Sequence, residues 1–270
     1  MDCTDGGLLD GRVRYAQPAE GFRSGIEPVL LAAAIPARDG DRVLEGGSGA
    51  GAGQLCVAAR VPGITGWGIE RDPSLAALAQ RNAAANGWTG LTFLAAAVEA
   101  IPESGSFDHA FANPPYHVTA GTPSPMRDRH QAKHAAADPF ATWATSLARR
   151  LRPRGTLTLI ATAADLPACI AAFGAARCGS GCLLPLWPRQ GRPAKLALLQ
   201  GVKGGRGPFR ILPGLVLHGD GPGYTPEAEA ILRSASALPI FVSSSRGALA
   251  TKRSISPARW IATPPRSGSR

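Results

Sequence analysis

The sequence has few acidic residues, no long hydrophobic run and no regular pattern of cysteines. It has 270 residues, of which 44% are apolar, and this content suffices for one well-buried globular domain rather than a fibre. The longest early apolar run, residues 28–37, is too short to cross a bilayer, and the N-terminus is acidic before it is apolar. We therefore expect a cytoplasmic protein with no membrane partner.

The five cysteines are odd in number and unevenly spaced, a pattern that favours reduced thiols over a disulfide framework. Cys178 and Cys182 have a spacing that would suit half of a metal site. No second pair and no nearby histidine completes a ligand set. The sequence therefore predicts no metal site.

The positive charge is concentrated at one end of the chain. The formal net charge is +10, and residues 239–270 hold six basic residues and no acidic ones. This segment contains serine and proline without periodicity, which is typical of disorder. We predict one folded domain over residues 1–238 followed by a basic tail, 239–270, that is disordered. The remaining body is only modestly positive, which is compatible with RNA binding.

Apolar runs typical of buried strands alternate with helical patterns. The predicted strands span residues 41–47, 64–70, 91–97, 107–113 and 155–162. This alternation predicts an α/β fold with a doubly wound, mostly parallel sheet. Two further apolar runs, 182–188 and 195–203, have too few residues between them for a helical crossover. They predict an antiparallel pair at one edge of a seven-stranded sheet.

A glycine-rich turn follows the first predicted strand. Gly47, Gly49 and Gly51 alternate with other residues, and glycine lets the backbone pass close to a ligand. Glu70, at the end of the second strand, is placed to accept hydrogen bonds from ribose hydroxyls. We therefore predict a nucleoside-binding site, to which Ser48 and Arg71 also contribute.

Two cofactors fit such a turn, a dinucleotide and S-adenosylmethionine. The antiparallel edge pair favours the second, and so does Glu45, because a carboxylate in the turn repels a pyrophosphate. Glu45 can instead orient the loop or approach the cationic methionine end. We therefore expect S-adenosylmethionine as the cofactor and methyl donor.

The strand over 107–113 ends in the turn Asn113-Pro114-Pro115-Tyr116. Two prolines stop the strand and fix the turn. In a sheet of this order, the turn faces the glycine loop across the cleft. The Asn113 side-chain oxygen and the Pro114 carbonyl can accept the two hydrogens of a planar –NH2 group, while Tyr116 offers a face for stacking. The turn therefore predicts transfer of a methyl group to an –NH2 nitrogen.

These residues resemble the class I methyltransferases with an Asn-Pro-Pro-Tyr motif, and more closely the bacterial valine-tRNA adenine-N6 methyltransferases. The resemblance rests on "GFRSGIEPVLLAAA", "VLEGGSGAGAG", "GIERDPSLAALAQRNAAANG" and "FDHAFANPPYH", together with the late "KGGRGPFRILPGLVLHGDGPGYTPEAEAILR". It implies a Rossmann-like fold, a first segment (1–40) that closes over the cofactor, and Gly25 and Glu27 beside the methionine pocket. The implied substrate is the adenine beside the anticodon of a tRNA.

The sequence departs from this family at two informative positions. Gly46 stands where a larger residue is usual, which is expected to loosen the strand. Ala97 stands where the family has an aspartate that reads the cofactor adenine, with Glu99 two positions later. These departures raise the possibility of a paralogue that binds RNA but has lost the cofactor and catalysis.

An RNA partner is also suggested by a basic cluster directly after the Asn-Pro-Pro-Tyr turn, comprising Arg127, Arg129, His130, Lys133 and His134. The alternative enzyme is a methyltransferase of a glutamine side-chain amide in a protein, because the same turn suits that –NH2 group. Proteins of that group generally carry an additional helical N-terminal domain. The oligomeric state is left open, with a monomer as the default.

Overall fold

The structure is a computed structural model that describes residues 1–21, 23–115 and 139–240. Tyr116 and the basic cluster at 127–134 lie outside the described residues, as does the chain after residue 240. The strands are β1 (Cys3–Leu8), β2 (Val13–Pro18), β3 (Arg42–Gly46), β4 (Thr65–Glu70), β5 (Leu91–Ala95), β6 (Phe107–Ala112), β7 (Leu151–Thr162), β8 (Cys178–Arg189), β9 (Leu196–Lys203), β10 (Arg210–Ile211) and β11 (Leu215–His218). The helices are α1 (Glu27–Ala34), α2 (Ala52–Arg60), α3 (Pro73–Ala85), the 3-10 turn η1 (Val98–Ala100), α5 (Pro139–Arg150), α6 (Leu166–Ala175) and α7 (Pro226–Ser234).

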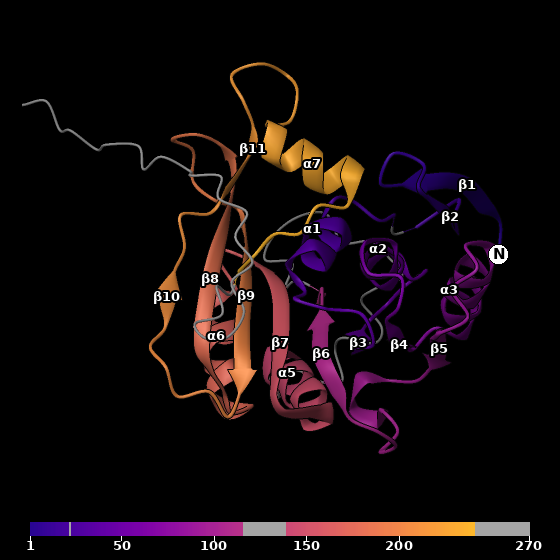
Figure 1. The fold of residues 1–270 in the computed structure, drawn as a ribbon, viewed down its shortest axis with the longest axis horizontal. Coiled ribbons are helices and arrows are strands. Elements are labelled where there is room, and N and C mark those ends of the chain that lie inside the picture. Colours follow the sequence, from indigo (N-terminus) through magenta and orange to yellow (C-terminus); the bar gives the residue numbers. More distant parts are fainter. Residues whose placement is uncertain (22, 116–138, 241–270) are drawn as a thin grey trace, which may run out of the picture.

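The central sheet has nine strands in the order β10-β8-β9-β7-β6-β3-β4-β5, with β11 also paired to β8 (Figure 1). The strands β3 to β7 are mutually parallel, whereas β9 is antiparallel to both β7 and β8. The predicted doubly wound sheet and its antiparallel pair are thereby confirmed.

Two details of the predicted sheet were wrong. Seven strands were expected, but β10 and β11 add two short strands parallel to β8. The antiparallel pair therefore does not form the edge of the sheet. These strands have only two and four residues, and Pro213 lies between them, so neither carries a readable strand period.

Helices cover both faces of the sheet. One buried cluster packs α1, α2, α3 and α7 on the first face, and a second packs α5, α6 and η1 on the other. Gln200 on β9 fastens α1 to the sheet, because its Nε2 donates to the Ala34 carbonyl at 3.0 Å and to Thr158 Oγ1 at 2.7 Å. No helix among the described residues is both long and apolar enough to cross a membrane.

The N-terminal residues form a two-stranded antiparallel sheet of their own, β1 with β2, which the sequence reading did not predict. Leu9 and Asp10 in its turn have positive φ angles of 53° and 58°. The Asp10-Gly11 pair is a hairpin signal. Val13 and Tyr15 alternate with more exposed residues and pack into the first core cluster, so the hairpin lies against the body.

The predicted loosening at Gly46 is wrong, because a neighbouring side chain fills the space. A Cβ added to Gly46 would lie 3.2 Å from Leu147 Cδ2 and 3.4 Å from Val98 Cγ2. Leu147, on α5, is fully buried. Glycine thus lets α5 pack closely on β3 rather than leaving a void.

The division of the chain at residue 238 stays a prediction. Leu238 donates its backbone N–H to the Ala33 carbonyl at 2.8 Å, and Ile240 is 2% exposed within the first core cluster. A variant that removes the basic tail should therefore retain Ile240.

Candidate functional site

The glycine loop connects β3 to α2 at the carboxyl edge of the sheet. Gly47, Gly49 and Gly51 have φ angles of 65°, 53° and 93°, in the left-handed region that favours glycine. A Cβ on Gly47 would also lie only 2.6 Å from Trp143 on α5. The sequence pattern therefore has a steric cause, because the loop both turns sharply and passes close to a bulky side chain.

Glu70 fastens the glycine loop to the end of β4. Its Oε2 accepts the backbone N–H of Gly49 at 2.9 Å, and its Oε1 accepts that of Asp72 at 3.0 Å. Ser48 donates its backbone N–H to the Ile69 carbonyl at 3.0 Å. Each carboxylate oxygen has two lone-pair directions, so Glu70 can hold the loop and still accept a further hydrogen bond.

Glu45 lies beneath the loop as a buried carboxyl group. Its Oε2 accepts the backbone N–H of Gln54 on α2 at 2.9 Å, and its Oε1 fills the space where a Cβ of Gly53 would stand. Burial raises the pKa of Glu45 well above its ordinary value, because the ionised form loses hydration. The carboxyl group is therefore poised to respond to a positive charge in its neighbourhood.

The register of the sheet brings Asn113 to the same edge. Ala112 on β6 pairs with Gly46 on β3, so the residues after both strands emerge side by side. Asn113 is half-buried, Pro114 is buried and Pro115 is exposed. The Asn-Pro-Pro turn thus starts directly beside the start of the glycine loop.

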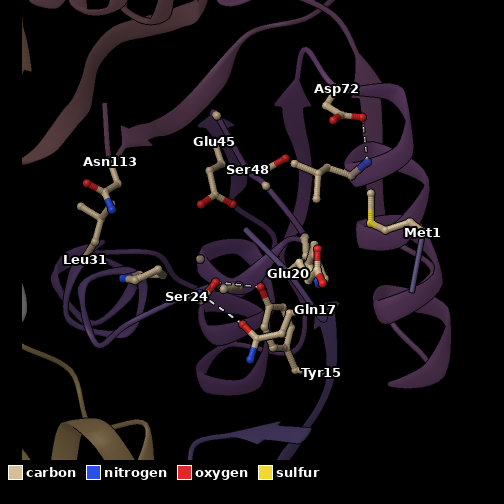
Figure 2. A pocket seen from close by; sticks show the side chains of 18 residues that line it. Met1, Tyr15, Gln17, Glu20, Ser24, Leu31, Glu45, Ser48, Asp72 and Asn113 are labelled. Carbon is tan, nitrogen blue, oxygen red and sulfur yellow. Dashed lines mark hydrogen bonds between the residues drawn. The ribbon is translucent and has the colours of Figure 1, made fainter. Parts of the chain in front are cut away.

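A cavity of about 320 Å³ lies between the glycine loop, the start of α3, α1 and the N-terminal hairpin (Figure 2). This size is within the range of small-molecule sites. Five predicted site residues line it, namely Glu45, Gly47, Ser48, Gly49 and Asn113. In the view of Figure 2, Asn113 and Met1 lie at opposite sides of the lining, with Glu45 and Ser48 between them.

The other predicted site residues are not part of the cavity lining. Arg71, Gly25 and Ala97 are exposed. Glu27 folds back over Gly25, where an added Cβ would meet its carboxylate. Gly51 and Glu70 stand behind the lining and shape the loop. Only part of the predicted set therefore lines the cavity, and residues that were not predicted complete the lining.

The N-terminal hairpin contributes a wall of the cavity. It belongs to the segment 1–40 that was expected to close over the cofactor, but Tyr15, Gln17 and Ser24 were not among the predicted site residues. Tyr15 Oη and Ser24 Oγ are 2.8 Å apart, and the Ser24 backbone N–H donates to Gln17 Oε1 at 3.2 Å. Figure 2 shows this group below Glu45. Burial is the main cause that raises the pKa of Tyr15 to about 12, so its phenol stays neutral. The alternation of Val13 and Tyr15 after Asp10-Gly11 was the signal that could have found it.

Asp72 and Ser48 complete the opposite wall. Asp72 Oδ1 accepts the backbone N–H of Ser74 at 2.8 Å as the cap of α3. The Ser48 side chain is 5% exposed, and its Oγ has no hydrogen-bond partner within the described part of the chain. A buried hydroxyl without a partner beside a cavity is typical of a site that a polar ligand completes.

Comparison with known proteins agrees with this geometry. A family model described as the methyltransferase small domain matches residues 27–168, from α1 through the glycine loop and the Asn-Pro-Pro turn to the start of α6. The chain belongs to this methyltransferase family. The predicted class of protein is thereby confirmed, and the cavity lies at the carboxyl edge of its sheet.

Two relatives show how far the similarity extends. A tRNA1(Val) adenine-N6 methyltransferase from Shewanella sediminis is 32% identical over 141 residues, which cover 50% of this chain and 57% of the relative. The chain thus matches little more than half of that protein's length. A solved structure from Agrobacterium tumefaciens, titled a predicted O-methyltransferase, has a TM-score of 0.66 at 24% identity and covers 78% of this chain and 98% of its own.

A 16S rRNA N2 methyltransferase from T. thermophilus, solved in complex with AdoMet and guanosine, has a TM-score of 0.50 at 22% identity. The similarity covers 75% of this chain and 50% of the solved one. Both solved structures share the fold with this chain. Among the residues that the structure describes, no group of three or more His, Cys, Asp or Glu side chains is arranged to hold a metal ion.

Proposed function

We propose that the protein is an S-adenosylmethionine-dependent methyltransferase that methylates the exocyclic N6 of an adenine in RNA. The finer proposal for the substrate is the adenine next to the anticodon of a tRNA. The observation that carries the proposal is that Asn113 and the glycine loop line one cavity. A cofactor site and an acceptor for a planar –NH2 group are therefore adjacent.

Two lining residues, Ser48 and Glu45, and the neighbouring Glu70 fit the proposed cofactor. The Ser48 hydroxyl has no partner within the described chain and can bind a polar group of the ligand. Glu70, which already accepts the Gly49 N–H, has lone pairs left for a ribose hydroxyl. Glu45 lines the same cavity and suits a positively charged ligand end, since a cation favours the ionised carboxylate. When bound, S-adenosylmethionine supplies an electrophilic methyl group on a sulfonium.

In this proposal, Asn113 and Pro114 bind and orient the –NH2 group of the substrate. An exocyclic –NH2 is a poor nucleophile because its lone pair is delocalised into the ring. The Asn113 Oδ1 and the Pro114 carbonyl accept its two hydrogens and hold the nitrogen so that its lone pair faces the methyl group. Pro114 and Pro115 fix the angle of these acceptors, and such orientation is a large part of catalysis. Methyl transfer from a sulfonium would release a neutral thioether, and the methylated, positively charged nitrogen would lose its proton to water, so no strong general base is required.

The tRNA proposal is supported by the relative from Shewanella sediminis, which is a tRNA1(Val) adenine-N6 methyltransferase. The basic cluster at 127–134 and Tyr116 belong to the same proposal as RNA contacts, with Tyr116 stacking on the base. Both lie outside the described residues. A monomer acting in the cytoplasm stays a prediction.

The test is transfer of a labelled methyl group by the purified full chain to an anticodon stem-loop RNA. The matched control RNA carries inosine at the target position, because inosine lacks the exocyclic –NH2. We expect N6-methyladenine in the first RNA and no transfer to the second. Equal labelling of both RNAs would contradict N6 as the acceptor.

Two further measurements separate the alternatives. Labelling of a glutamine-containing protein in place of RNA would favour the amide methyltransferase. Calorimetry with S-adenosylmethionine tests the non-catalytic paralogue, since RNA binding without cofactor binding would identify it. Mass spectrometry of tRNA nucleosides from cells with and without the gene then identifies the modified tRNA.

A further inference from the structure

Asn82 on α3 and Asn86, which caps the C-terminus of that helix, lie one helical turn apart and bind the backbone of β2. Asn86 Oδ1 accepts the Arg14 N–H at 2.9 Å, and its Nδ2 donates to the Arg14 carbonyl at 2.8 Å. Asn82 repeats this arrangement with Ala16, at 3.0 Å and 2.8 Å. Four helical residues rise about 6.0 Å and two strand residues span about 6.6 Å, so the spacing of the two asparagines nearly matches that of Arg14 and Ala16. The side-chain amides thus act as a neighbouring strand for the hairpin.

The two asparagines differ in one contact. The Nδ2 of Asn82 also donates to the Ala50 carbonyl in the glycine loop at 2.9 Å, and Asn82 is 4% exposed. The second donation from Asn86 goes to the Asn82 carbonyl within the same helix, at 2.8 Å. Asn82 therefore touches both the hairpin and the glycine loop, whereas the bonds of Asn86 reach the hairpin and its own helix.

The two segments that Asn82 joins form facing walls of the cavity. The hairpin supplies Tyr15, Gln17 and Pro18, and the glycine loop supplies residues 47–50. A buried amide with both donors and its acceptor engaged fixes its partners closely. A shift of the hairpin relative to the loop would change the width of the cavity and the position of Tyr15 beside Ser24.

We propose that Asn82 is a positioning residue of the ligand pocket, which holds the N-terminal hairpin in register with the glycine loop so that the two walls close on one ligand. The proposal rests on the proposed function, which takes the ligand to be S-adenosylmethionine. Asn82 acts through the backbone of Ala16 and Ala50 and is not a member of the cavity lining.

The test compares Asn82→Ala with Asn86→Ala in the full chain. Each variant loses three hydrogen bonds, two of them to β2, so both should lower the melting temperature, and Asn82→Ala should lower it more because its bonds are more buried. Calorimetry with S-adenosylhomocysteine, the unreactive product of the cofactor, should show at least tenfold weaker binding for Asn82→Ala. The loss should stay below threefold for Asn86→Ala. Equal losses in the two variants would reduce Asn82 to an ordinary structural contact and overturn the proposal.

Hydrogen exchange without ligand supplies a readout that is independent of the cofactor. Asn82→Ala should speed exchange in the glycine loop, including the Gly51 N–H that donates to the Ser48 carbonyl at 2.8 Å. Asn86→Ala should speed exchange in the hairpin and leave the loop unchanged. An unchanged glycine loop in Asn82→Ala would overturn the proposal.

These outcomes are distinct from a failure of the proposed function. If the wild-type protein binds no S-adenosylhomocysteine, the proposal that S-adenosylmethionine is the cofactor fails. The proposal that Asn82 positions the site of that cofactor then fails with it. A wild type that binds while Asn82→Ala binds equally well would refute only the role of Asn82. Where Asn82→Ala does not fold, Asn82→Ser serves, since a serine hydroxyl is too short to reach both Ala16 and Ala50.

Discussion

The two ends of the neighbouring strands β3 and β6 differ in how completely their polar side chains are hydrogen-bonded. At the amino ends, Asp108 Oδ2 accepts the Arg42 backbone N–H at 2.7 Å, and its Oδ1 contacts the Arg152 guanidinium at 2.7 Å. The His109 ring bridges Thr156 Oγ1 at 2.8 Å and Asp41 Oδ2 at 3.1 Å. Both side chains are thus engaged by protein groups.

The carboxyl ends of the same strands leave polar groups incompletely matched. Glu45 is buried and accepts a backbone N–H, no described basic side chain forms an ion pair with it, and burial raises its pKa. Ser48 Oγ, just after β3, has no partner within the described chain. Buried polar groups normally find partners, and perturbed acids concentrate at functional sites. We therefore expect the amino end to contribute to folding and the carboxyl end to bind the proposed ligand.

The largest expected effect is on Asn113, at the end arranged for a ligand. Asn113→Ala should slow methyl transfer by roughly a hundred- to a thousandfold, or about 2.7–4 kcal/mol of barrier, by analogy with the loss of one oxyanion-hole donor. S-adenosylmethionine affinity should stay nearly unchanged, because the side chain acts on the substrate –NH2. Single-turnover transfer to an anticodon stem-loop measures the first effect, and calorimetry measures the second.

Asn113→Asp is the matched control, since it keeps an acceptor oxygen at the same position. It should lose much less activity than Asn113→Ala. Methyl transfer at the wild-type rate in Asn113→Ala would contradict the proposed mechanism.

The next effect concerns Glu70. Glu70→Ala should weaken S-adenosylmethionine binding by about 1.5–3 kcal/mol, because it removes charge-assisted hydrogen bonds, including the acceptor of the Gly49 N–H. Calorimetry measures the change. Glu99→Ala is the control, since Glu99 is an exposed carboxylate outside the cavity. Equal affinity in wild type and Glu70→Ala would remove Glu70 from the site.

At the amino ends of β3 and β6, we expect a mutation to change the stability of the fold and to leave ligand affinity unchanged. Asp108→Ala should lower the free energy of unfolding by about 1–3 kcal/mol, because the buried Arg42 N–H loses its acceptor and Arg152 its partner. Denaturant unfolding measures this loss. A tenfold loss of S-adenosylhomocysteine affinity in the same variant would break the contrast between the two ends.

The smallest expected effect is the pH dependence caused by Glu45. Its folded-state pKa is raised above the ordinary value of 4.5, so the folded protein holds a proton that the unfolded chain has released. Its contribution to stability is therefore lost as the pH rises above the ordinary value toward the raised one. A cationic ligand favours the ionised form, so affinity for S-adenosylmethionine should increase with pH, by at most about tenfold per pH unit.

Calorimetry between about pH 5 and 7 measures this dependence, below the ordinary pKa of the ligand's amino group. Glu45→Gln should flatten the curve, because it keeps the shape of the side chain without a titrating proton. An equally steep curve in Glu45→Gln would assign the dependence to another group.

The sequence alone determined the features that depend only on residues adjacent in the chain. The strand, glycine turn and helix over residues 42–60 are local, because the turn needs positive φ and the flanking periods are readable. The break at Asn113-Pro114-Pro115 is local as well, since the proline rings impose it. The order of these elements was enough for the parallel sheet and for the placement of Asn113 at the same edge as the glycine loop.

Only the tertiary structure decided which side chains share the cavity. Tyr15 and Ser24 belong to an N-terminal segment whose docking depends on Asn82, some 66 residues away from Ala16 along the chain. Glu70 turned out to accept from the glycine loop, and Leu147 to fill the space beside Gly46. Such contacts depend on sheet register and on helix packing across long stretches of sequence. No local pattern of residues encodes them, because each arises only when distant segments are brought together by burial of the common core.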